Sequence, residues 1–391
     1  MNPVIPDEEF RQRVARTRSL MEDADLDYLI AFSSYPEREG HLEYLVNYHG
    51  AFPTSQHDEV YRGLGYSALV LGPSVGPVLF PGLLFASGRL CGVEKVESSE
   101  DLPLSVTTFV SSSIGSETKK YPTVGLAGID IFPSLYLEEI KEGVSRKNGG
   151  KVKFSDAEGI LLGQRMVKSR AEQRVMRRAA EIADIGIQAA FDATKAGARE
   201  SEIGLAALRA CYEEGAGYVA RTRIYGRNIS GVRWPIMTNR KLQRGEITGI
   251  DLVGYYSNYG FDVLRLWTVG SPSATQKDFL NGAAQLTEKT IQRIRAGMSG
   301  DDVSNITMDV AKELGRAEVA SPFGHAIGLE IVEDPILLPK SRKSKLRCGA
   351  FLCVEPSLEL KGNQSVHFED EVLIKEDGRP QTISKCPKDF A

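Results

Sequence analysis

Histidine and cysteine are both scarce in this chain of 391 residues. The five cysteines are an odd number without Cys-x-x-Cys spacing, which favours reduced thiols in a cytoplasmic protein over a disulfide framework. A site that needs several imidazoles in the C-terminal half has only two available there. The five histidines are His41, His49, His57, His325 and His367.

Long apolar runs and an excess of basic charge are also absent. The longest apolar stretch, residues 66–85, is broken by Gly and Pro, whereas a membrane helix needs about 18 unbroken apolar residues. The N-terminal residues are acidic and polar and lack a hydrophobic signal core. Lys and Arg number 48 against 52 Asp and Glu, a formal net charge of −4. We therefore expect neither a membrane nor a nucleic acid among the partners.

The pattern of strands and helices predicts two domains. In residues 1–160, strand-like runs alternate with helical stretches, which indicates an α/β domain. Residues 161–391 show two rounds of a helical pair followed by strand-like runs, which predicts an α+β domain with helices covering an antiparallel sheet. The helical stretches of this second part are 168–197, 201–217, 277–297 and 300–315.

Acidic residues inside strand-like runs carry the strongest functional signal. Asp251 and Asp262 lie on two runs joined by the turn GYYSNYG, and a hairpin would bring them together. Glu355 and Glu369 stand in two later apolar runs, and His325 precedes the apolar AIGL. Carboxylates in apolar strands are costly unless a cation or a charge partner compensates them.

Four carboxylates that converge on one imidazole would form an oxygen-rich site for one or two divalent ions of Mn, Fe, Co or Zn. Each residue also has an ordinary explanation when taken alone. The aspartates suit a turn or a surface strand, the glutamates suit solvent-facing positions, and the histidine suits a core. Spacing alone leaves these alternatives open.

Taken together, the segments resemble the pita-bread-fold metallohydrolases, the superfamily of creatinase, prolidase, aminopeptidase P and methionine aminopeptidase. DLDYLIAFSS and EYLVNYHG resemble the opening strand and the "YLTG" region of the N-terminal domain in creatinase and prolidase. RMVKSRAEQRVMRR resembles the helix that opens the catalytic half. The resemblance implies an α+β fold, with a creatinase/prolidase-type N-terminal α/β domain (1–160) before a pita-bread metal-binding catalytic domain (161–391).

The same resemblance implies a ligand role for five residues. The two aspartates of the family's D-x(10)-D element match Asp251 and Asp262. GHAIGLEIVEDP resembles "GHgiGlevHE-P" and makes His325 the histidine ligand. CVEPSLEL resembles "tiEPGiY" and gives Glu355, while VHFEDEVLIKEDG resembles "vRiEDdvlvt-dG" and gives Glu369. Glu355 is also implied as the general base that handles the proton of the attacking water.

Three positions depart from the peptidase pattern. Trp234 stands where peptidases place a substrate-binding histidine, and Val332 replaces the second motif histidine. His367 stands where the family has an arginine. Those peptidase histidines hold the scissile carbonyl and its tetrahedral intermediate, which requires a hydrogen-bond donor. Trp donates one N–H without acting as acid or base, and Val donates nothing.

The departures argue against ordinary prolidase or aminopeptidase P chemistry, while the five retained ligands lead us to predict a metal-dependent hydrolase. Its substrate would be small and amino-acid-like, and the bond cleaved would be a C–N bond of amide, amidine or Xaa-Pro-like type. Its expected catalytic residues are Glu355, Glu333 and Trp234, with Glu333 orienting the substrate's amino group or a ligand. Two alternatives stay open. One is a metal-dependent lyase resembling the pita-bread dimethylsulfoniopropionate lyase, and the other is a non-catalytic binding module on the same scaffold.

Substrate contacts are expected from several aromatic and basic residues. Tyr255, Tyr259 and Trp234 would frame a small cationic substrate by cation–π contact, unless they only pack the sheet. His367 is expected beside them because of its motif position.

The N-terminal domain is the second expected source of substrate contacts. In creatinase and prolidase relatives, a loop of this domain reaches the active site of the neighbouring subunit in a homodimer. Residues 41–62, which include His57 and Arg62, would either do the same in a homodimer of this chain or form a solvated loop.

Overall fold

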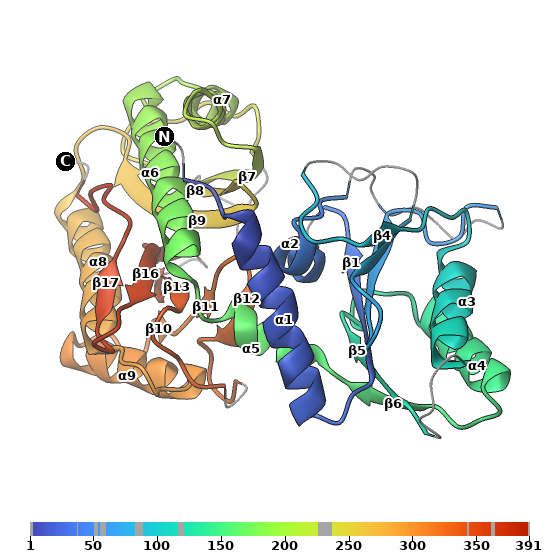
Figure 1. The fold of residues 1–391 in the computed structure, drawn as a ribbon. Helices are drawn as coiled ribbons and strands as arrows, with labels where there is room; N and C mark the ends of the chain where they lie inside the picture. The colour runs from blue at the N-terminus through green and yellow to red at the C-terminus, as the bar shows by residue number, and fades with distance from the viewer. Residues whose placement is uncertain are drawn as a thin grey trace. The chain divides into compact units, whose positions relative to one another are not determined.

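The computed structural model describes residues 3–36, 38–50, 54, 60–82, 89–115, 121–225, 237–341, 344–360 and 364–389. The predicted site residues Trp234 and His57 lie outside these ranges. The chain divides into two compact units, Ile5–Arg165 and Met166–Ala391 (Figure 1). The division falls at the end of helix α5 (Glu158–Arg165).

The N-terminal unit is built on a six-stranded sheet in the order β4-β3-β2-β1-β5-β6. Strand β1 pairs antiparallel with β2 and parallel with β5, so the sheet is mixed. The strands are β1 (Tyr28–Ser34), β2 (Tyr66–Leu71), β3 (Val78–Pro81), β4 (Lys95–Val96), β5 (Thr123–Ala127) and β6 (Lys153–Asp156). Helices cover both faces of this sheet. Helices α1 (Asp7–Asp23) and α2 (Gly40–Val46) lie with α5 on one side, and α3 (Leu102–Gly115) and α4 (Ser134–Lys147) lie on the other (Figure 1).

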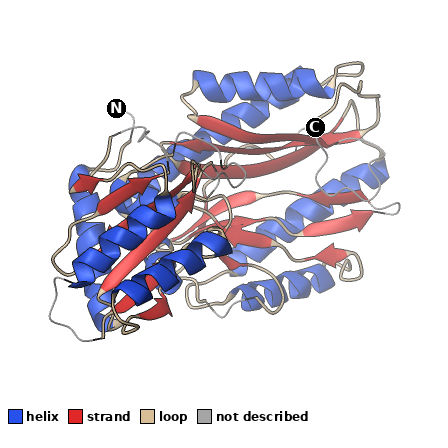
Figure 2. Ribbon diagram, turned by 90° about the vertical axis from the view of Figure 1, so that its right-hand side faces the viewer, coloured by secondary structure: helices blue, strands red, loops and turns tan. Residues whose placement is uncertain are grey.

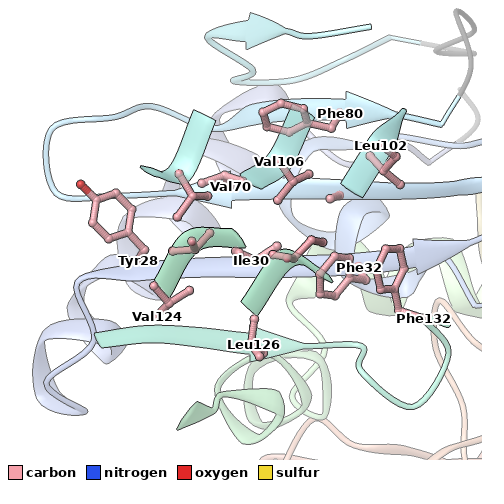
Figure 3. Close-up of a cluster of buried hydrophobic side chains, with 14 of the residues drawn as sticks. Tyr28, Ile30, Phe32, Val70, Phe80, Leu102, Val106, Val124, Leu126 and Phe132 are labelled. Carbon is pink, nitrogen blue, oxygen red and sulfur yellow. The ribbon is translucent and has the colours of Figure 1, made fainter. Parts of the chain in front are cut away.

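The core of this unit lies between the sheet and helices α3 and α4. Because alternate side chains of β1 point to the same face of the sheet, Tyr28, Ile30 and Phe32 are buried together in one cluster (Figure 3). Phe32 stacks on Phe132 with ring centroids 4.0 Å apart. Val106 on α3 belongs to the same cluster, so the helix is held by apolar burial.

The C-terminal unit contains two rounds of helices and strands, in the order the sequence predicts. Helices α6 (Arg170–Ala193) and α7 (Glu200–Glu213) precede a three-stranded sheet, β7-β8-β9. Helices α8 (Ala274–Arg293) and α9 (Gly300–Glu313) precede sheets β12-β11-β13-β16-β17 and β10-β14-β15. Strands lie between helices in this unit (Figure 2). The strands are β7 (Tyr218–Tyr225), β8 (Ile247–Tyr256), β9 (Tyr259–Thr268), β10 (Ala320–Ser321), β11 (Gly324–Ala326), β12 (Glu333–Ile336), β13 (Phe351–Val354), β14 (Ser357–Leu360), β15 (Gln364–His367), β16 (Asp370–Ile374) and β17 (Pro380–Thr382).

Helix α6 begins at a capping box that the sequence encodes. The Ser169 side chain accepts a hydrogen bond from the Glu172 backbone N–H, and the Glu172 carboxylate accepts one from the Ser169 N–H. This arrangement satisfies two backbone donors at the start of the helix. The helix then covers β8 and β9.

Neither a disulfide nor a membrane-spanning helix is found in the described part of the chain. All five cysteines are free thiols, as their spacing predicts. None of the described helices combines the length and apolarity needed to cross a bilayer.

Candidate metal centre

A tight hairpin joins the two strands that carry the predicted aspartates. Tyr256 pairs with Tyr259 across the turn, and the two residues between them, Ser257 and Asn258, have φ angles of 48° and 68°. Two consecutive positive φ angles are the signature of a type I′ turn, whose twist matches that of the flanking strands. The hairpin expected from GYYSNYG is therefore present.

The register of this hairpin places both aspartates on one face. Asp251 on β8 pairs with Leu264, and Asp262 on β9 pairs with Val253. Because side chains alternate along a strand, Asp251 and Asp262 are diagonal neighbours on the same side of the sheet. Both side chains are buried. The structure thus brings together two acids that stand eleven residues apart in the sequence.

A second row of polar side chains comes from the five-stranded sheet. His325 on β11 pairs with Cys353 on β13, and Cys353 pairs with Glu371 on β16. Directly paired residues share a face, so these three side chains form a row across the sheet. Glu355 and Glu369 stand two residues from members of this row, which favours the same side.

The two rows meet around the Nε2 atom of His325. This atom lies 3.6 Å from Glu355 Oε1, 3.8 Å from Asp262 Oδ2 and 3.9 Å from Glu369 Oε1. The other ring nitrogen, Nδ1, donates a hydrogen bond to the Ala326 carbonyl oxygen at 3.0 Å. Since a carbonyl can only accept, the proton is on Nδ1 and the lone pair of Nε2 faces the carboxylates.

These distances fit a divalent cation better than hydrogen bonds. Two ligands that are each about 2.1 Å from one ion are at most about 4.2 Å apart, and the three separations fall below that limit. Asp262 Oδ1 and Glu369 Oε1 are buried and have no hydrogen-bond donor among the described residues. A buried acceptor without a donor is unfavourable, and a cation would satisfy both oxygens.

The electrostatics of the cluster point the same way. Burial and neighbouring carboxylates raise the pKa values of Asp262 and Glu369 well above their ordinary range. Burial raises the pKa of Asp251 to about 6, although the positive charge of Arg223, 3.5 Å away, opposes the shift. Burial lowers the pKa of His325 to about 4, so its imidazole is neutral near pH 7, as a metal ligand must be.

A buried arginine fixes the backbone behind the cluster. Arg265 donates to the carbonyl oxygens of Glu369 at 2.6 Å and Leu264 at 2.8 Å, and to Asp370 Oδ1 at 2.6 Å. Lys388 Nζ pairs with Asp370 Oδ2 at 2.7 Å. Asp370 therefore points away from the cluster while its neighbour Glu369 points into it, as alternation along a strand requires.

Two other predicted residues lie close to these ligand candidates. His367 is buried, with Nε2 3.7 Å from Glu355 Oε2 and 3.4 Å from the hydroxyl of Tyr225. Glu333 is also buried, and its Oε2 accepts a hydrogen bond from Lys168 Nζ at 2.9 Å. This ion pair compensates the charge of Glu333 from within the protein.

The predicted substrate contacts are placed less uniformly. Tyr255 shares the face of Asp251 and stacks with Tyr218 at 6.4 Å. Tyr259 is on the opposite face, where its buried hydroxyl donates to Glu172 of α6 at 2.8 Å, a contact that fits the packing alternative. Arg62, in the N-terminal unit, is engaged in ion pairs.

The contacts of Arg62 are local to that unit. One guanidinium nitrogen donates to Asp101 at 2.8 Å, and the other pairs closely with Glu139. The guanidinium also lies over the ring of Tyr136 at 5.3 Å. Arg62 thus ties the segment before β2 to Asp101, directly before α3, and to helix α4. Of the remaining predicted contacts, Trp234 and His57 are outside the described residues.

Three side chains at the cluster were not anticipated from the sequence. Glu371 accepts a hydrogen bond from the Asp262 N–H at 3.0 Å, and the alternation of Glu369 with Glu371 was a usable signal. Burial and the surrounding carboxylates raise the pKa of the Tyr225 hydroxyl. Nothing in the local sequence identifies Tyr225 as a residue of the cluster. Burial, followed by the charges of Glu369 and Asp262, raises the pKa of the Cys353 thiol.

Comparison with known proteins identifies a matching family and similar sequences. Residues 174–376 match the model of metallopeptidase family M24. An Xaa-Pro dipeptidase from Pyrococcus horikoshii is 26% identical over 259 residues, which cover 65% of this chain and 72% of the relative.

Solved structures agree over nearly the whole chain. The prolidase from Pyrococcus horikoshii has a TM-score of 0.76 at 20% identity, covering 97% of this chain and 100% of its own. An Xaa-Pro dipeptidase from Bacillus anthracis has a TM-score of 0.77 at 22% identity, covering 97% and 99%. These likenesses confirm the expected α+β fold, an N-terminal domain followed by a pita-bread domain.

Proposed function

The chain belongs to metallopeptidase family M24, as its resemblance to the pita-bread metallohydrolases implied, and on that premise we propose that it hydrolyses a C–N bond in a small amino-acid-like substrate, such as an Xaa-Pro dipeptide. The observation that carries the proposal is the approach of three carboxylates to within 3.9 Å of His325 Nε2. The Xaa-Pro dipeptidase from Pyrococcus horikoshii supports the substrate class.

The metal would be held by the five residues that the sequence motifs single out. Asp251, Asp262, His325, Glu355 and Glu369 supply four carboxylates and one neutral imidazole, a donor set for one or two ions of Mn, Fe, Co or Zn. A divalent ion held by these residues would lower the pKa of water and polarise the substrate carbonyl.

Glu355 acts as the general base. Its two oxygens face His325 on one side and His367 on the other, at 3.6 and 3.7 Å. Glu355 takes a proton from the attacking water and passes it to the leaving nitrogen as the C–N bond breaks. The water oxygen becomes part of the new carboxyl group.

Tyr225 and His367 supply hydrogen-bond donors next to Glu355. Tyr225 keeps its proton near neutral pH, as an ordinary tyrosine does, and burial followed by the charge of Asp251 raises its pKa further. A donor at this place stabilises the negative charge that develops on the substrate oxygen. This role matters because Val332, at the position of a peptidase histidine, has no donor and exposes 53% of its surface.

The test joins metal analysis to a screen of Xaa-Pro dipeptides, other amides, ectoine, creatine and sulfonium or betaine compounds. We expect the purified protein to contain a divalent metal and to hydrolyse one of these. D262A should lose metal and activity together, whereas D309A, which changes an exposed aspartate on α9, should keep both. Full activity in metal-free D262A would refute the proposal.

The reaction type is tested on the product. Hydrolysis in heavy-oxygen water places the label in the new carboxyl group of an amide substrate, or in the new amide or urea oxygen of an amidine substrate, and elimination incorporates no label. An unlabelled product would replace the hydrolase by the lyase alternative. The homodimer and the substrate contacts of His57 and Trp234 stay predictions.

A further inference from the structure

Cys353 occupies a position that the hydrolytic mechanism does not use. It is fully buried on β13, paired with His325 on one side and with Glu371 on the other. Side chains of paired residues share a face, so its sulfur points to the same side as the imidazole. In the "tiEPGiY" pattern that CVEPSLEL resembles, Cys353 stands at the first position, where the pattern has "t".

The sulfur is close enough to the other candidate ligands to share an ion with them. Cys353, His325, Asp262 and Glu369 each offer one ligand atom, and these four atoms all lie within 4.8 Å of one another. Independently of the sulfur, the buried Asp262 Oδ1 and Glu369 Oε1 have no hydrogen-bond donor among the described residues. Two buried acceptors without donors, aimed at the same place, indicate a cation there.

We propose that Cys353 is a sulfur ligand of the metal centre in this chain. The inference rests on the proposed function, because it presumes that the cluster binds a metal. On coordination the thiol releases its proton to solvent and a metal–sulfur bond forms, with no change of oxidation state.

Sulfur in the ligand set narrows the choice of metal. Thiolate is a soft ligand that favours Zn²⁺ and Co²⁺, whereas Mn²⁺ and Mg²⁺ prefer carboxylates, carbonyls and water. A centre of oxygen and nitrogen ligands alone would suit Mn²⁺ as well. Cys353 therefore biases the centre toward zinc or cobalt.

The competing explanation is a structural thiol. Cys353 Sγ donates to the Asp262 carbonyl oxygen at 3.7 Å, and that contact alone would explain a buried cysteine. Cys211 offers a matched comparison, because it is also fully buried and its Sγ lies 3.8 Å from the Ile182 carbonyl oxygen. Cys211 is on α7 and is not a member of the metal-binding cluster.

The experiment compares the full chain with C353A, C353S and C211S after loading with Co²⁺ or Zn²⁺. We expect a sulfur-to-cobalt charge-transfer band in the wild type and in C211S, and its loss in both Cys353 variants. X-ray absorption of the zinc forms should show a sulfur neighbour at about 2.3 Å only where Cys353 is present. Zinc-over-manganese preference should fall roughly tenfold or more in C353A.

C353S controls for a folding defect, because serine has a side chain of similar size to cysteine and keeps a hydrogen-bond donor for the Asp262 carbonyl oxygen. Spectra and zinc preference that are identical in wild type and C353S would overturn the sulfur ligand while leaving the metal centre intact. Failure of every protein to take up metal would overturn the metal centre and the sulfur ligand together.

Discussion

Replacement of Arg265 by Met tests how much the buried ion pair behind the candidate metal centre contributes to the free energy of unfolding. Arg265 is completely buried on β9 and donates to the carbonyl oxygens of Glu369, Leu264 and Cys386. It also pairs with Asp370 at 2.6 Å, and both side chains are inaccessible to solvent. Methionine has a similar length but no donors, so the change removes hydrogen bonds and leaves a buried carboxylate.

The burial of the Arg265–Asp370 pair determines how much unfolding free energy R265M should lose. Breaking a buried ion pair by removal of one partner costs about 3–5 kcal/mol, because the other charge remains without its partner. Lys388, 2.7 Å from Asp370 Oδ2, offsets part of this charge, which places R265M toward the lower end of that range. The double variant R265M/D370L removes both charges and should lose less than R265M alone.

The assay is urea unfolding followed by circular dichroism, with the transition of the C-terminal unit analysed separately because the chain has two units. R293M is the control, since Arg293 pairs with Glu313 at 2.6 Å on the exposed surface of α8. We expect R293M to be indistinguishable from wild type. If R265M lowers the free energy of unfolding by less than about 1 kcal/mol, the claim that burial makes the loss of this ion pair costly is refuted.

Two further changes test other assignments. Y259F should cost about 1 kcal/mol through the lost hydrogen bond to Glu172, measured by urea unfolding, and a raised KM would restore Tyr259 as a substrate contact. In the N-terminal unit, burial disfavours the Glu158 carboxylate, but hydrogen bonds from His41 and Gly128 outweigh it and lower its pKa to about 2. Its stabilisation, about 3 kcal/mol, is complete above pH 4.5 and lost as the pH falls toward 2. Urea unfolding of wild type and E158Q should differ at pH 7 and coincide near pH 2; a constant difference would contradict this.

Local chemistry made the hairpin predictable from the sequence. Ser257 and Asn258 lie between strand-like runs that each carry an aspartate, so turn type and spacing together determine that Asp251 and Asp262 meet. The family motifs added His325 and the two glutamates. Composition and periodicity alone left each of these residues with an ordinary structural explanation.

Long-range pairing was not predictable in the same way. Lys168 and Glu333 are 165 positions apart, and no local pattern marks them as partners. Tyr225 reaches the cluster because β7 pairs with β8, so that Arg223 opposes Asp251 and Tyr225 follows on the same face. Strand register decides such contacts, and a register shift of one residue would turn each side chain to the other face.

The two histidines of the C-terminal half both belong to the candidate metal centre or its surroundings. His325 and His367 are the two histidines of that half, and both lie within 4 Å of Glu355. A cluster with so many buried carboxylates is unfavourable without positive charge, and Arg223 brings a guanidinium to within 3.5 Å of one of them, Asp251. Asp262 Oδ1 and Glu369 Oε1, which have no hydrogen-bond donor among the described residues, would be compensated by a metal ion or by protons. If a metal ion fills this place and Glu355 is the general base proposed above, metal content and hydrolysis should be lost together.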